Sequence, residues 1–258
     1  MPKLKYTFAD YMANPAGRGS AVKNVTHADT YEYEKELMSL ESRNGKSSYT
    51  VYRVTKNAGT QVYYIHFLIP SSTKGFFNDV VLEFTQNESD QSSIRTINHY
   101  SIRFFSNDTN FVYTYAYTFK SHGLMIPEFE KKIPLRCLIQ KPTMRNPDNA
   151  MGHNKAICYS YVIMNKHNLF NKDELNRIAV SGGLTKLVSS VPNFEQKTKE
   201  RNEITKEEKE KGKKEESNNV KVVKSKGLLG NSLPAKPKFT SVIGNVKKTS
   251  TVKKIKKR

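Results

Sequence analysis

The sequence predicts an α+β protein, with a mainly antiparallel β-sheet domain, two or more flanking helices and a disordered basic tail. Three observations predict this class. Apolar residues alternate with period two in short runs between residues 48 and 119, and turn residues separate the runs. Of the 13 Phe and 14 Tyr residues, only Phe239 lies beyond residue 195. Residues 217–258 contain 12 Lys and Arg and no Asp or Glu.

These shifts in composition divide the chain into four segments. They are an N-terminal arm over 1–28, a strand-rich globular domain over 29–195, a mixed-charge linker over 196–216 and the disordered basic tail over 217–258. Asn14, Pro15, Gly17 and Gly19 interrupt both helical and strand periodicity in the arm, so we expect the arm to dock onto another surface.

The domain is predicted to begin with a helix over 31–43. Asp29 or Thr30 supplies a capping side chain, and Asn44-Gly45 supplies a stop signal. Five strands are expected next, over 49–54, 61–69, 79–85, 100–105 and 110–119. Because parallel neighbours need long crossover connections, the short links between these strands predict an antiparallel sheet.

Four prolines between residues 127 and 147 predict a loop region, with a short helix near 128–132. The apolar run AICYSYVIMN over 156–165 is interpreted as a further buried strand, and Asn171 is expected to start a helix. Residues 196–216 mix Lys and Glu, which suits a solvated helix or a linker. Gly212 and the lack of an apolar stripe favour the linker.

An aromatic ladder is the densest local feature. On a strand, five rings would point to one face: Phe111, Tyr113, Tyr115, Tyr117 and Phe119. Such a face could stack unpaired bases, although packing against a helix is the ordinary alternative. No Lys or Arg is interleaved with the rings, and the residue pattern of an RRM is absent, which favours the packing interpretation.

No motif commits the chain to catalysis, so we expect no enzyme activity, no metal and no cofactor. No two of the six histidines have the spacing of metal ligands, and Cys137 and Cys158 are interpreted as free thiols. A metal-dependent nuclease would require a cluster of carboxylates that only the fold can bring together, from Asp79, Glu83, Asp90 and Asp108.

The chain offers two further contact segments. The polar turn RNPDN over 145–149 could form an inter-subunit contact. The tail is expected to bind nucleic acid or another polyanion without sequence specificity, through Lys221, Lys224, Lys226, Lys236, Lys238, Lys247, Lys248, Lys253, Lys254, Lys256, Lys257 and Arg258. Two apolar nodules in the tail, 227–229 and 239–243, suggest short docking peptides.

No run of about 18 apolar residues and no signal peptide is present, so we expect a soluble protein made in the cytosol that has no membrane partner. No small-molecule substrate is evident.

The stretches FADYMANPAGRGSA, RFFSNDTNFVYTYAYTF and RNPDN resemble uncharacterised virion structural proteins of tailed bacteriophages, over about residues 6–180. The resemblance implies a virion or assembly component made in the host cytoplasm, with other virion proteins or copies of itself as partners. It carries no catalytic or binding residue onto this chain. The leading hypothesis is therefore a non-enzymatic structural protein, and the alternative is a single-stranded nucleic-acid binding protein of replication or transcription control.

Overall fold

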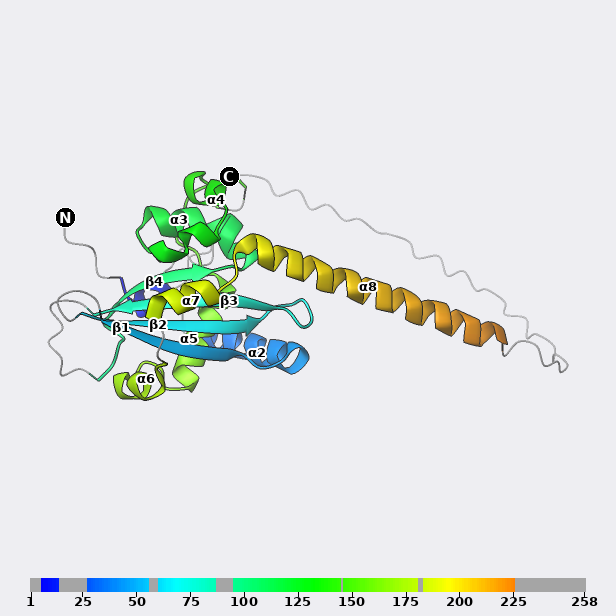
Figure 1. The fold of residues 1–258 in the computed structure, drawn as a ribbon, viewed down its shortest axis with the longest axis horizontal. Helices are drawn as coiled ribbons and strands as arrows, with labels where there is room; N and C mark the ends of the chain where they lie inside the picture. Colours follow the sequence, from blue (N-terminus) through cyan, green and yellow to red (C-terminus); the bar gives the residue numbers. More distant parts are fainter. Residues whose placement is uncertain are drawn as a thin grey trace, which may run out of the picture. The chain divides into compact units, whose positions relative to one another are not determined.

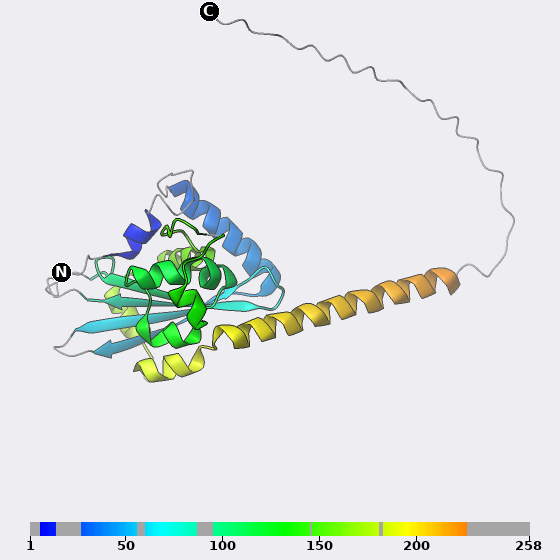
Figure 2. The same cartoon turned by 90° about the horizontal axis from the view of Figure 1, so that it is seen from above.

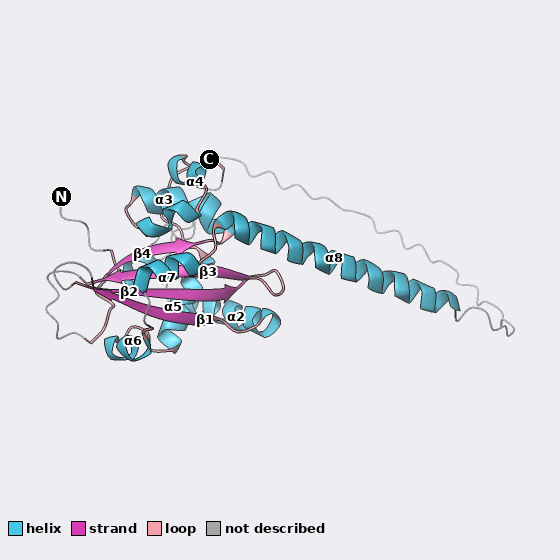
Figure 3. Cartoon of the chain, viewed as in Figure 1, coloured by secondary structure: helices cyan, strands magenta, loops and turns pink. Residues whose placement is uncertain are grey.

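The computed structural model describes residues 6–13, 27–55, 60–86, 95–144, 146–180 and 183–225. Within these ranges, side chains are described for residues 6–13 and from residue 30 to residue 211. The chain divides into two compact units, residues 1–211 and 212–258. The first unit has an antiparallel sheet with helices packed on it, which confirms the predicted α+β class (Figures 1 and 3).

The sheet has four strands in the order in which they occur along the chain. They are β1 (Ser48–Thr55), β2 (Gln61–Pro70), β3 (Phe77–Thr85) and β4 (Ser101–Ser106). All neighbours are antiparallel, and the four strands predicted between residues 49 and 105 are confirmed within two residues at each end. Because β2 and β3 are central, most of their side chains are buried on both faces.

Helices lie on both faces of this sheet. On one face lie α2 (His27–Asn44) and α5 (Lys155–Lys166), and α7 (Gly183–Ser190) lies on the other, beside β1 (Figures 1 and 2). The predicted helix after Asn171 is α6 (Lys172–Ile178), in which the Asn171 side chain accepts a hydrogen bond from the Asp173 N–H at 2.8 Å. The predicted short helix is the 3₁₀ helix η4 (Pro127–Lys132), which α4 (Leu135–Ile139) follows.

The strand predicted over 110–119 is wrong. The segment forms a π-helix, η3 (Phe111–Tyr115), that continues into α3 (Ala116–Ser121). Asp108 favours the helical start because its Oδ2 accepts a hydrogen bond from the Phe111 N–H at 3.2 Å. In helical geometry the five rings cannot share one face: Phe111 and Phe119 are fully buried, whereas Tyr113 is 39% exposed.

The strand predicted over 156–165 is also wrong, because this segment is helix α5. Asn154 is its N-cap, and the Asn154 Oδ1 accepts a hydrogen bond from the Ile157 N–H at 3.2 Å. The helix is buried on nearly all sides, so its sequence shows a continuous apolar run in place of an amphipathic period.

The linker favoured over 196–216 is wrong as well, because this segment belongs to helix α8 (Phe194–Ser225). A reciprocal capping box starts α8: the Gln196 N–H donates to Asn193 Oδ1 at 2.8 Å, and the Asn193 N–H donates to Gln196 Oε1 at 2.9 Å. These bonds satisfy backbone donors at the helix start and so stabilise the first turn of α8, although the helix lacks an apolar stripe.

The part of the predicted arm that the structure describes is not an exposed arm. Residues 8–12 form α1 (Phe8–Met12), whose side chains Phe8, Tyr11 and Met12 belong to the hydrophobic core. The Tyr11 hydroxyl accepts a hydrogen bond from the Asn154 N–H at 2.8 Å. This segment therefore docks onto its own chain; the remainder of the arm, 1–5 and 14–26, lies outside the described residues.

Candidate functional site

A buried polar cluster joins the sheet to the first turn of α8. The Asp79 carboxylate on β3 lies 2.8 Å from His66 Nε2, 2.8 Å from Asn107 Nδ2 and 3.5 Å from Lys197 Nζ. The Asp79 and Lys197 side chains are only 2% and 10% exposed. The Lys197 ammonium also lies 5.0 Å from the centre of the Phe76 ring. This cluster fixes the position of α8 in the first unit by charge pairing away from bulk water.

A second buried carboxylate, that of Glu83, is paired with an arginine from the neighbouring strand. Arg103 Nη1 donates to Glu83 Oε1 at 3.2 Å, and the Thr85 hydroxyl donates to the same oxygen at 3.1 Å. Burial, followed by the nearby carboxylates of Glu83 and Glu128, raises the pKa of Tyr64, so this phenol stays neutral.

The acidic residues proposed for a metal site do not come together. Asp79 and Glu83 have separate partners, and Asp108 Oδ2 accepts from Asn154 Nδ2 at 2.8 Å. Asp90 lies outside the described residues. Among the residues that the structure describes, no three His, Cys, Asp or Glu side chains are grouped so that they could hold a metal ion.

The turn proposed as an inter-subunit contact is held by its own chain. Asn146 Nδ2 donates to the Thr114 carbonyl at 3.2 Å and to the Thr118 hydroxyl at 3.1 Å. The Thr118 hydroxyl donates in turn to Asn149 Oδ1. These bonds fasten the turn to η3 and α3, while Arg145 lies outside the described residues.

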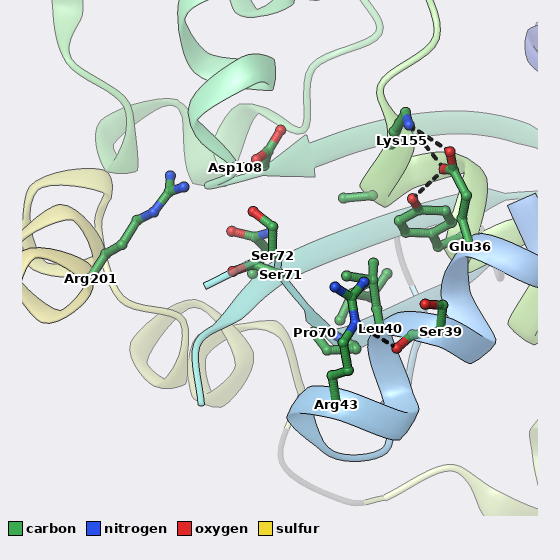
Figure 4. A pocket seen from close by; sticks show the side chains of 14 residues that line it. Glu36, Ser39, Leu40, Arg43, Pro70, Ser71, Ser72, Asp108, Lys155 and Arg201 are labelled. Atoms are coloured by element: carbon green, nitrogen blue, oxygen red, sulfur yellow. Dashed lines mark hydrogen bonds and ion pairs between the residues drawn. The ribbon is translucent and has the colours of Figure 1, made fainter. Parts of the chain in front are cut away.

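A pocket of about 470 Å³ lies in the first unit (Figure 4). We call it the Arg43–Arg201 pocket. Five elements and two loops supply its walls: α2, the facing ends of β2 and β3, α5, α8, the β2–β3 connection and the loop after β4. The pocket is lined by Glu36, Ser39, Leu40, Arg43, Ile69, Pro70, Ser71, Ser72, Asn78, Asp108, Lys155, Ala156, Tyr159 and Arg201.

On one wall of this pocket, Glu36, Lys155 and Tyr159 pair with one another. Lys155 Nζ lies 2.8 Å and 3.0 Å from the two Glu36 carboxylate oxygens, and the Tyr159 hydroxyl donates to Glu36 Oε2 at 2.7 Å. Burial alone would raise the pKa of Glu36, but the hydrogen bonds from Lys155 and Tyr159 lower it below its ordinary value. Burial, followed by the neighbouring Glu36, raises the pKa of Tyr159.

The other walls carry two arginines without carboxylate partners among the described residues. Arg43 Nε donates to the Ser39 carbonyl at 3.1 Å. Arg201 Nε donates to the Thr73 hydroxyl at 3.2 Å, and Arg201 Nη1 donates to the Thr109 hydroxyl at 3.1 Å. Sequence reasoning missed this pair because the two residues lie 158 positions apart and no local pattern links them.

The tail residues proposed to bind nucleic acid lie mostly beyond the described part of the chain. Lys221 and Lys224 lie in the last turns of α8, and their side chains are not described. The other ten residues of the set, Lys226, Lys236, Lys238, Lys247, Lys248, Lys253, Lys254, Lys256, Lys257 and Arg258, lie outside the described residues.

Comparison with family models, curated proteins and solved structures found no match to this chain. Within the described residues, no helix is long and apolar enough to cross a membrane. The thiols of Cys137 and Cys158 form no disulfide.

Proposed function

We propose that this protein is a non-enzymatic structural or assembly protein, a component of a tailed-bacteriophage virion, and that its basic C-terminal segment contacts nucleic acid. The observation that carries the proposal is the change of charge along α8. Residues 206–211, KEEKEK, are fully solvated and carry both signs, so their fields largely cancel. The acid-free segment from residue 217 onward has no such compensation.

The anchoring of α8 supports separate roles for the folded domain and the basic segment. Lys197 is paired with Asp79 in the buried cluster, so the basic segment is tethered to a folded domain through the helix that precedes it. Because the tether carries nearly balanced charge, it adds little attraction of its own to a polyanion. Contact with nucleic acid would then depend on the residues beyond 217.

The folded domain supports a role in assembly. The buried carboxylates Asp79 and Glu83 are both occupied by cations of the same chain, an arrangement that stabilises a fold and offers no reacting group. Leu135, Ile139 and Met144 are 67%, 63% and 91% exposed. We propose that these side chains contact a protein partner, either another virion protein or a second copy of this chain.

Two measurements test the proposal. Mass spectrometry of purified particles should detect the protein at a fixed ratio to a known shell or tail protein. A chain ending at Glu216, which keeps Lys197 and Arg201, should lose most of its affinity for duplex DNA at low salt. Absence from particles would refute the structural role, and full DNA affinity in the shortened chain would refute the role of the tail.

A further inference from the structure

Among the residues that the structure describes, the guanidinium of Arg201 is held in place by neutral groups. Hydroxyls from two separate loops, those of Thr73 and Thr109, accept hydrogen bonds from it, and its central carbon lies 5.9 Å from the centre of the Phe76 ring. Neither hydroxyl carries charge, so the positive charge of this half-buried group stays uncompensated within the described residues. An arginine fixed in this way is positioned to bind an anion.

A second cation faces the same hollow from a different wall. Figure 4 shows Arg43 on α2 and Arg201 on α8 on opposite sides of the pocket, with Ser71 and Ser72 between them. Arg43 donates one hydrogen bond, to the Ser39 carbonyl of its own helix, so other N–H donors of its guanidinium are available.

The acidic groups of the pocket are already engaged. Glu36 is paired with Lys155 and Tyr159, and Asp108 Oδ2 accepts hydrogen bonds from Asn154 Nδ2 and the Phe111 N–H. With Lys155 neutralising Glu36, the two arginines outweigh Asp108 and the pocket keeps a net positive charge. A positive pocket with low-dielectric walls attracts small anions.

We propose that the Arg43–Arg201 pocket binds a small phosphorylated organic molecule. The two arginines and the Ser72 hydroxyl would supply the donors for the phosphoryl group, because guanidinium N–H pairs match phosphate oxygens. The volume of about 470 Å³ falls within the range of small-molecule sites and exceeds what a bare phosphate needs.

The apolar part of the pocket would hold the organic part of the ligand. Leu40, Ile69, Ala156 and the Tyr159 ring contribute carbon surface to the lining. Sites for small molecules typically combine such surface with a few polar groups that fix orientation. This inference is independent of the proposed contact between the tail and nucleic acid.

Isothermal titration calorimetry on the full chain tests it, with adenosine monophosphate and inorganic phosphate as probes. The monophosphate should bind more tightly than inorganic phosphate, since only the former covers the apolar wall. Arg201→Gln and Arg43→Gln should each weaken monophosphate binding about tenfold or more. The hydrogen bond of Arg43 is to the Ser39 carbonyl of its own helix, so Arg43→Gln should fold normally even if Arg201→Gln loosens α8.

Two controls separate the pocket from other cations. Arg177→Gln removes an exposed arginine that pairs with Glu174 on α6 and should leave binding unchanged. Lys253→Gln with Lys254→Gln removes tail charge and should also leave it unchanged. The proposal is overturned if no monophosphate binding is detected, if inorganic phosphate binds equally well, or if Arg43→Gln has no more effect than these controls.

Discussion

The ammonium of Lys197, in the first turn of α8, lies 3.5 Å from the carboxylate of Asp79 on the central strand β3, and both side chains are shielded from solvent. Glu200 lies 3.2 Å from the same ammonium on the exposed side. This pair joins the start of the long charged helix to the core of the folded unit, together with the bonds of Arg201 to Thr73 and Thr109.

Asp79→Asn should destabilise the protein by about 3 kcal/mol, because it leaves Lys197 buried with a single, exposed carboxylate partner. It also weakens the bonds to His66 and Asn107. Urea unfolding measures the change in free energy. Glu174→Gln, which removes an exposed ion pair with Arg177, is the matched control and should cost far less stability. Equal effects of the two substitutions would mean that Asp79 does not hold α8.

Phe119→Ala should cost about 3–5 kcal/mol of stability, because this ring is fully buried among aromatic neighbours. Its centre lies 5.3 Å from that of Phe104 and 5.2 Å from that of Phe111. Tyr113→Ala, at a position 39% exposed, should cost less. A stable Phe119→Ala variant with weakened binding to a single-stranded oligonucleotide would restore the aromatic-face hypothesis.

Gly152→Ala should destabilise the fold by about 1–3 kcal/mol, the usual cost of forcing extra atoms into a packed site. A Cβ at this position would lie 2.4 Å from the nearest ring carbon of Tyr115 and 2.6 Å from its hydroxyl. The double variant Gly152→Ala/Tyr115→Leu should recover part of the loss, since the clash is with the ring itself. Thermal denaturation of the two single variants and the double variant measures this. If the two single losses simply add in the double variant, the clash with the Tyr115 ring is not the cause of the destabilisation.

The Glu36–Lys155–Tyr159 group should make stability depend on pH in the acid range. The pKa of Glu36 is lower in the folded state than its ordinary value of 4.5, so folding favours the carboxylate form. Its contribution is complete well above pH 4.5 and is lost as pH falls through the folded-state pKa. The difference in unfolding free energy between the wild type and Glu36→Gln should therefore be constant near neutrality and shrink in acid. A difference that grows in acid would contradict the assignment.

The sequence predicted the sheet well because β1 to β4 are short, largely apolar runs separated by turn residues, a local signal. It failed where tertiary packing decided the outcome. The alternation of rings from Phe111 to Phe119 is typical of a strand, yet burial of Phe111 and Phe119 against the core is compatible with a helix that contains a π turn.

Two of the missed helices carried readable start signals. Asn154 before α5, and Asn193 before α8 together with Gln196 in the first turn of α8, are capping residues at the expected spacing. The pocket had no such signal. Arg43 and Arg201 line one pocket because the fold brings parts of α2 and α8 to the same hollow, and that arrangement depends on contacts between distant parts of the chain.

The dependence of DNA affinity on salt tests the central claim most directly, with two variants of equal charge change. One carries Lys247→Gln, Lys248→Gln, Lys253→Gln and Lys254→Gln in the tail. The other carries Lys199→Gln, Lys206→Gln, Lys209→Gln and Lys211→Gln in α8. The tail variant should lower the slope of log K against log salt by about 0.9 for each lost phosphate contact, while the α8 variant keeps the wild-type slope. Equal slopes in the two variants would contradict the account.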